Sequence, residues 1–190
     1  MQRQASTVAF AVAVGACLLA TAITLPAAPY ADGAPPGFSG GFREPSCDAC
    51  HFETEINARP GQLTIAGIPE RFVPGERYPL TITLSRPGMR LGGFQFTARL
   101  DDGAQAGTIE PVPEERERIK IDVTGNIQYA NQRTAGTALS APDTARWTLL
   151  WAAPTVAGVV QFHAAANAAD NDESVRGDYV YTAAAQSTAQ

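Results

Sequence analysis

Two cysteines and a histidine lie within five positions of one another and are the residues best suited to chemistry. They are Cys47, Cys50 and His51, in the segment EPSCDACHFE. Two thiols at this spacing can form thioether bonds with the vinyl groups of a haem, and the adjacent imidazole can bind its iron. The motif therefore predicts covalent haem c held by Cys47 and Cys50, with His51 as the proximal iron ligand.

Other chemistries fit the same three residues. A Cys47–Cys50 disulfide would close a very short loop with strained geometry. A thioredoxin-like redox pair would require a helix start within a βαβ unit, which the flanking sequence does not indicate. A structural zinc site would need two more ligands, and His163 is the only credible one. Haem is the favoured interpretation, and the disulfide is the main alternative.

The motif lies in residues 30–60, a segment rich in Gly, Pro, Ser and Asp that shows no apolar periodicity. Such composition predicts irregular chain that cannot bury itself. It must be held by a cofactor, by a disulfide or by the domain that follows. A haem would also need cover for its apolar faces, and the aromatic residues near the motif, Phe38, Phe42 and Phe52, are the expected contacts.

A second axial ligand for the iron would have to come from few residues. Beyond the N-terminal apolar run, the chain offers Met89, in a Pro-Gly loop, and His163, in an alternating apolar segment. We expect Met89 rather than His163 to be the distal ligand, although a gap-filling methionine and an ordinary strand histidine are the plainer interpretations. Methionine ligation would raise the reduction potential and a second histidine would lower it. An open position would allow ligand binding.

The N-terminus predicts export. Arg3 precedes an uncharged apolar run over residues 7–25, followed by small residues, as in a signal peptide. The run is also long enough to span a bilayer, so residues 1–29 are either a cleaved signal or a signal anchor. Cys17 stands in a sequence that loosely resembles a lipoprotein box. Each alternative places the rest of the chain in the periplasm or outside the cell, where haem c attachment and disulfide formation both occur.

Composition limits the partners. Charged residues make up 17% of the chain, and the formal net charge is −5. A mildly acidic chain without a Lys/Arg cluster argues against nucleic acid, because binding to phosphates requires concentrated positive charge. The expected partners are a redox protein or a membrane complex, with a membrane tether through residues 7–25. The acidic loop ADNDESVRGD, residues 169–178, fits a solvated turn better than a Ca²⁺ site.

From residue 61 onward, short runs alternate apolar and polar residues between Gly, Pro and Asp turns. In RYPLTITLS, for example, Tyr78, Leu80, Ile82 and Leu84 fall on one face. Repeated period-two alternation without helical patterns predicts an all-β, immunoglobulin-like antiparallel β-sandwich. We place this domain at residues 61–183 and expect residues 184–190 to be a disordered tail.

Several short motifs of this domain resemble a known family. They are GFQ at residues 93–95, WAAP at 151–154, GVVQF at 158–162 and GD at 177–178. In order and spacing they resemble the bacterial choice-of-anchor V domain, a relative of the reeler domain, whose bacterial members often carry C-x-x-C-H just upstream. The resemblance implies a secreted reeler-like β-sandwich with c-type haem.

The chain departs from that family in two places. Members often end in a C-terminal surface anchor, whereas this chain ends in AAAQSTAQ, so any tether is expected at the N-terminus. The resemblance also implies a histidine near NIQYANQRT, where Gln132 and Arg133 stand instead.

The sequence thus predicts an exported monohaem c-type cytochrome that carries electrons or supports a periplasmic redox complex, and not a catalyst. Two alternatives stay open. One is a non-catalytic extracellular binding or structural module with a Cys47–Cys50 disulfide, and the other is an accessory subunit of a membrane complex anchored by residues 7–25.

Overall fold

A computed structural model describes residues 30–190 of the chain. The predicted signal or anchor, residues 1–29 with its apolar run at 7–25, lies outside these described residues. Within residues 30–190, no helix combines the length and the apolar character that crossing a membrane would require.

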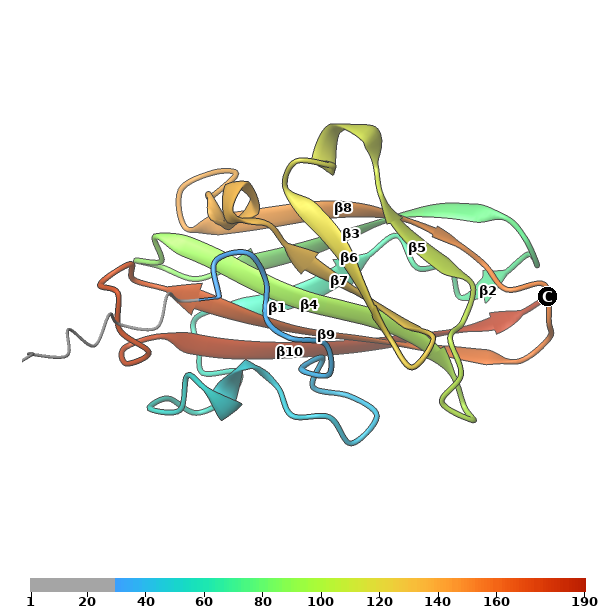
Figure 1. The fold of residues 1–190 in the computed structure, drawn as a ribbon, viewed down its shortest axis with the longest axis horizontal. Coiled ribbons are helices and arrows are strands. Elements are labelled where there is room, and N and C mark those ends of the chain that lie inside the picture. Colours follow the sequence, from blue (N-terminus) through green and yellow to red (C-terminus); the bar gives the residue numbers. More distant parts are fainter. Residues whose placement is uncertain (1–29) are drawn as a thin grey trace, which may run out of the picture.

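Ten strands and three short 3-10 helices make up the described chain (Figure 1). The strands are β1 (Gln62–Ala66), β2 (Arg71–Phe72), β3 (Arg77–Ser85), β4 (Leu91–Leu100), β5 (Thr108–Pro111), β6 (Ile119–Thr124), β7 (Ile127–Gln132), β8 (Thr144–Ala152), β9 (Val159–Ala169) and β10 (Tyr179–Ala189). The 3-10 helices are η1 (Cys47–Ala49), η2 (Pro113–Glu115) and η3 (Thr134–Thr137).

The strands form two sheets packed face to face. One sheet has the order β1-β3-β8-β5, and the other has the order β2-β10-β9-β4-β7-β6. All pairings are antiparallel except the short one between β2 and β10. The predicted all-β antiparallel sandwich is therefore confirmed.

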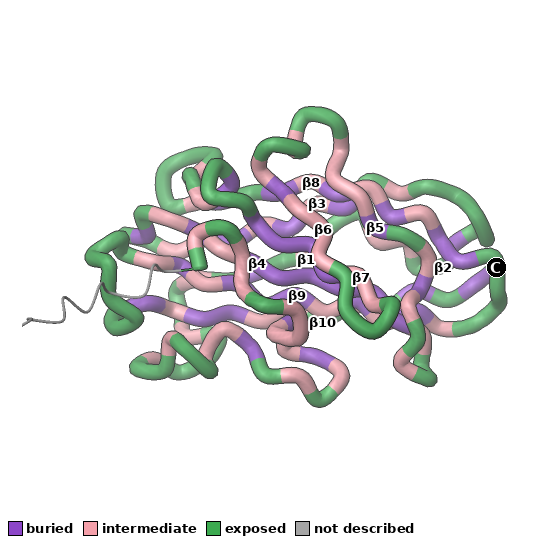
Figure 2. The backbone as a smooth tube through the Cα atoms, in the orientation of Figure 1, coloured by how far each residue is buried: buried purple, intermediate pink, exposed green. Residues whose placement is uncertain are grey.

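The core lies between the sheets and follows the alternation visible in the sequence (Figure 2). On β8, Trp147, Leu149 and Trp151 are fully buried. The ring of Trp147 stacks on Phe94 of β4 at 4.5 Å between centroids. Each indole N–H donates to a backbone carbonyl, at 2.9 Å in both cases, so these large side chains are buried without an unpaired polar group.

Between residue 30 and the start of β1 the chain forms no strand, in keeping with the irregular segment predicted for residues 30–60. This segment crosses the outer face of the six-stranded sheet and is drawn in blue to cyan in Figure 1. Hydrogen bonds to β4 and β10 hold it there, including those from the Gly37 amide to Gln95 Oε1 (3.0 Å) and from the Asn57 amide to the Val180 carbonyl (2.9 Å). The sandwich itself thus holds the segment.

The expected disordered tail at residues 184–190 is wrong. Strand β10 continues to Ala189, and Ala184 to Thr188 pair with β9 in an unbroken register. Ser187 and Ala189 are buried. The sequence AAAQSTAQ hides this strand because alanine contrasts weakly with its polar neighbours, and backbone pairing with β9 on one side and β2 on the other decides the conformation.

Removing residues 184–190 should therefore destabilise the domain. The truncation deletes five paired positions along β9 and the partner of β2. At about 1 kcal/mol net per hydrogen bond, we expect a loss of at least about 3 kcal/mol in the free energy of unfolding. Urea denaturation of the truncated chain measures it, and removal of Gln190 alone is the control. An unchanged denaturation midpoint would instead indicate that residues 184–190 are a disordered tail.

Candidate functional site

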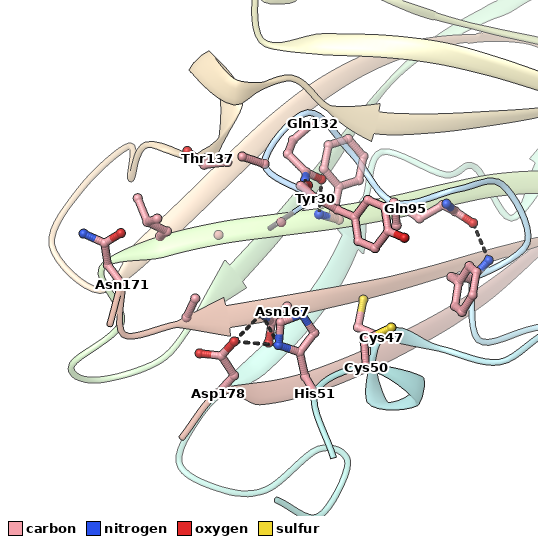
Figure 3. A pocket seen from close by; sticks show the side chains of 18 of the residues that line it. Tyr30, Cys47, Cys50, His51, Gln95, Gln132, Thr137, Asn167, Asn171 and Asp178 are labelled. Carbon is pink, nitrogen blue, oxygen red and sulfur yellow. Dashed lines mark hydrogen bonds and ion pairs between the residues drawn. The ribbon is translucent and has the colours of Figure 1, made fainter. Parts of the chain in front are cut away.

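A pocket of about 230 Å³ lies on the outer face of the six-stranded sheet, where the C-x-x-C-H motif crosses it (Figure 3). Its walls come from four parts of the chain. They are the N-terminal segment (Tyr30, Ala34, Pro35, Phe38), the motif (Cys47, Cys50, His51), the sheet (Leu91, Gly93, Gln95, Gln132, Asn167, Ala169) and the β9–β10 connection (Asn171, Asp172, Glu173, Ser174, Asp178). Most of the surface nearest the motif is apolar or amide in character.

The two cysteines are held by a single helical turn. The amides of Cys50 and His51 both donate to the Cys47 carbonyl, at 3.1 and 3.0 Å. Both thiols are free and line the pocket, with their sulfur atoms on its side of the motif in Figure 3. Burial raises the pKa of the Cys47 thiol to about 12, so this thiol is protonated at neutral pH. Cys50, in contrast, is exposed to solvent.

The imidazole of His51 is oriented by a buried carboxylate. Its Nδ1 lies 2.6 Å from Oδ2 of Asp178, whose side chain is 2% exposed. Asn167 Nδ2 donates to the same oxygen at 2.9 Å, and the Asp170 amide donates to the other oxygen at 3.3 Å. Because Asp178 Oδ2 accepts the Nδ1 proton, the neutral ring has its lone pair on Nε2, which lies 3.4 Å from Asn167 Nδ2. Histidines that bind metals are commonly oriented by such a partner.

Gln95 fixes the wall of the pocket opposite the motif. Its side chain is 1% exposed and lies on the outer face of β4. Oε1 accepts the amides of Gly37 and Phe38, at 3.0 and 2.5 Å. Nε2 donates to the Pro35 carbonyl (2.8 Å) and to Asn131 Oδ1 (3.0 Å). One side chain thereby satisfies three backbone groups of the segment and all of its own polar valences.

A second buried cluster holds the chain just before the motif. Arg99, on the outer face of β4, forms an ion pair with Glu44, and Tyr129 donates to the same carboxylate oxygen at 2.5 Å. Burial alone would raise the pKa of Glu44, but hydrogen bonds from Ser39, Tyr129 and Arg99, with the charge of Arg99, outweigh it and hold that pKa below 4.5. Burial and the Glu44 charge raise the pKa of Tyr129 to about 12.

Of the three aromatic residues predicted to cover a haem, one lines the pocket. Phe38 does so, next to Gln95. Phe42 instead packs edge-on against His163, with centroids 4.8 Å apart, and lies under the Arg99 guanidinium. Phe52 is 62% exposed and is not part of the wall. The sequence could not distinguish these cases, because nearness to the motif along the chain does not give the side to which a loop residue points.

The structure does not bring Met89 to His51. Met89 is 4% exposed and belongs to the core. A Cβ placed on Gly92 would meet Ala145, Trp147 and, at 3.4 Å, the Met89 methyl carbon, so Met89 packs on the core face of β4. His51 lies on the opposite face of that sheet. The plainer interpretation, a methionine that fills a gap in the sandwich, describes its place.

His163 is also kept apart from His51. It is on the correct face of the sheet, but Gly41 and Phe42 cover its ring so closely that a Cβ on Gly41 would overlap it. Burial lowers the pKa of His163, which favours its neutral form. Asn167, which contacts His51, is four residues further along β9, or about 13 Å at 3.3 Å per residue.

Asn167 and Asp178 contact His51, and sequence reasoning identifies neither of them as its partner. Asp178 was visible within the GD motif and the acidic loop, but without a partner. The loop itself is the expected turn, since the Asp172 amide donates to Asp170 Oδ1 (3.1 Å) and the Ser174 amide to Asp172 Oδ1 (2.8 Å). Gly177 adopts φ +79°, the left-handed region that favours glycine, and sets Asp178 at the start of β10.

A scan against protein-family models finds no match to the sequence, and neither does a search of curated proteins. Solved structures with a similar fold include the human F-spondin reeler domain, with 20% identity and a TM-score of 0.45, over 72% of this chain and 93% of that one. The Reelin-N domain of F-spondin has 20% identity and a TM-score of 0.48, over 76% of this chain and 95% of that one. A cohesin module of a Clostridium perfringens family 33 glycoside hydrolase has 9% identity and a TM-score of 0.48, over 68% of this chain and 96% of that one. At these identities the likenesses concern the fold alone.

Replacing Gln95 by alanine should release the pocket wall. The change leaves the amides of Gly37 and Phe38 without their acceptor, and unpaired buried donors cost about 1–3 kcal/mol each. We expect hydrogen exchange at both amides to become fast and the free energy of unfolding to fall by about 2 kcal/mol or more. Gln161→Ala is the matched control, since that strand glutamine bonds only to exposed Asp101. Equal effects of the two variants would refute the role of Gln95.

Replacing Glu44 by glutamine should destabilise the protein in a pH-dependent way. At pH 7 the variant leaves the Arg99 charge without its partner, at a cost of about 3 kcal/mol. Because the folded pKa of Glu44 lies below its ordinary 4.5, the wild-type advantage is complete above pH 4.5 and is lost as pH falls through the folded value. Urea denaturation across this range measures the difference.

Glu53→Gln serves as the control for this series, because its pair with Arg176 is exposed. A Glu44→Gln difference that stayed constant with pH would contradict the charged role of Glu44.

Proposed function

We propose that this protein is an exported c-type haem protein that carries electrons, with haem attached to Cys47 and Cys50 and bound through His51. The observation that carries the proposal is the convergence of the motif on one pocket. Both free thiols line it, and buried Asp178 engages Nδ1 of His51. Nε2 would then be the ligand atom, and it would exchange its 3.4 Å contact with Asn167 Nδ2 for the iron. Covalent haem attachment would use all three side chains at once, which supports the proposal.

The donor set fits haem c. Two thiols supply the covalent links, one imidazole with an ordered second shell supplies the iron ligand, and an apolar wall that includes Phe38 and Leu91 suits a porphyrin. The bound haem would supply one-electron chemistry. The rim of the pocket includes exposed residues, among them Tyr30 and the β9–β10 connection. An electron carrier would need such an exposed edge, because it meets its partner at the surface.

The protein residues would act by holding and orienting the haem. Cys47 and Cys50 fix its position, and Asp178 holds the His51 ring and its tautomer. Asn167 in turn fixes the carboxylate. The resemblance to bacterial choice-of-anchor V proteins with upstream C-x-x-C-H supports this assignment and an extracytoplasmic location. The partner is then a redox protein or a periplasmic membrane complex.

One observation favours the second candidate, a non-catalytic binding or structural module with a Cys47–Cys50 disulfide. Gln95, Arg99 and Asn57 hold segment 30–60 on the sheet. These contacts would order the segment in a module that binds no cofactor. An accessory subunit anchored by residues 7–25 is a variant of either candidate.

Covalent haem decides between the two candidates. Expressed with a c-type maturation system, the wild-type protein should keep haem after denaturation, with a mass increase of one haem. Cys47→Ala or Cys50→Ala should each retain a single thioether, and the double variant should retain none. Mass spectrometry and in-gel haem staining measure this. A colourless wild-type product with its two cysteines oxidised would establish the disulfide module.

Phe52→Ala is the matched control for maturation, because Phe52 is close to the motif in sequence but 62% exposed. It should acquire haem as the wild-type protein does, and a loss of haem in this variant would show that the pocket wall has been misassigned.

A further inference from the structure

The chain offers very few side chains that could bind iron opposite His51. The whole sequence contains two histidines, two methionines, three cysteines and one lysine. In residues 30–190, setting aside Cys47, Cys50 and His51, this leaves Met89, His163 and Lys120 as strong nitrogen or sulfur ligands. The place of each of these three decides how an iron in the pocket would be coordinated.

All three are committed elsewhere. Met89 is inside the sandwich, with β4 between it and the pocket. His163 is covered by Gly41 and Phe42 further along β9. Lys120 lies between two carboxylates, with its Nζ 3.7 Å from Asp32 and 3.3 Å from Asp122, and it does not line the pocket. Moving any of them to the pocket would require opening the core or breaking these contacts.

The polar groups that do face the pocket are weak ligands. Gln95 has all its polar atoms in hydrogen bonds. Gln132 is likewise engaged, because its Oε1 accepts the Phe94 amide at 2.8 Å and its Nε2 donates to the Tyr30 carbonyl at 3.2 Å. The Oδ1 of Asn167 is buried and has no hydrogen-bond partner among the described residues. The remaining oxygen donors among the lining residues include Asn167 Oδ1, the Tyr30 phenol and the exposed carboxylates of Asp172 and Glu173, and all of them are weak ligands for reduced haem iron.

We infer that, on the proposed function, the described part of the chain leaves one axial position of the iron without a protein ligand, so that the site binds a small neutral diatomic molecule such as carbon monoxide or nitric oxide. Neutral molecules are favoured over anions because Asp172 and Glu173 line the same pocket. Their exposed carboxylates repel an anion, and salt screens that repulsion. The protein would then sense or store such a ligand as well as exchange electrons.

Carbon monoxide is the probe. The haem-loaded, reduced wild-type protein should have a five-coordinate high-spin spectrum and bind one CO per haem with a shift of the Soret band. Met89→Leu, His163→Gln and Tyr30→Phe should bind CO with unchanged affinity. A reduced wild-type protein that is low-spin and inert to CO would overturn the inference, and so would a variant among these three that alone gains CO binding.

Azide binding tests the role of the Asp172 and Glu173 carboxylates. Azide binding to the oxidised protein should strengthen with added salt and in the Asp172→Asn, Glu173→Gln double variant, while CO binding stays the same. Equal changes in CO and azide binding would contradict selection by charge. The two proposals fail separately, because absence of covalent haem refutes the function, whereas covalent haem with a low-spin, CO-inert iron refutes the open position alone.

Discussion

The outer face of β4 carries Gln95, Thr97 and Arg99, and all three are buried. Burying a polar side chain is costly unless it is hydrogen-bonded, and a buried guanidinium also needs a counter-charge. Segment 30–60 supplies backbone amides to Gln95 and the Glu44 carboxylate to Arg99. Among the buried polar atoms of these two side chains, only Nε of Arg99 is left without a partner. The path of this irregular chain is therefore dictated by the polar face of one strand.

This constraint places the C-x-x-C-H motif. Gln95 holds the chain before it, the Glu44–Arg99 pair holds it three residues before Cys47, and Asn57 joins it to β10 through the Val180 carbonyl and Thr182. Between these anchors the motif has one helical turn and little freedom. A site already ordered before it receives a ligand loses less entropy on binding, which would suit the proposed presentation of Cys47 and Cys50 to a haem.

The sequence predicts those features of the fold and the site that depend on local pattern. Alternation such as that of Leu80, Ile82 and Leu84 is enough to establish strands and a core face, and the spacing of Cys47, Cys50 and His51 is itself local. The partnership of His51 with Asn167 and Asp178 is different, because it depends on how the β9–β10 hairpin is paired, with Tyr179 opposite Ala168. The sequence alone does not give that register, and alanine-rich β10 lacks the contrast that would reveal its full length.

The position of Met89 likewise depends on which face of the sheet a residue occupies, and the sequence alone does not give that face. The same choice of face decides which groups line the pocket. Along β4, Gly92 and Phe94 point into the core, while Gly93 and Gln95 point to the pocket, so a shift of one residue moves a side chain to the other face of the sheet. The Met89 side chain joins the core face, and the face with His51 receives amides and a tyrosine. On the proposed function, the Asp178 carboxylate would make His51 a stronger electron donor to the iron, which would favour the oxidised state. With one well-supported histidine on one side and weak groups on the other, the iron would keep room for an external ligand.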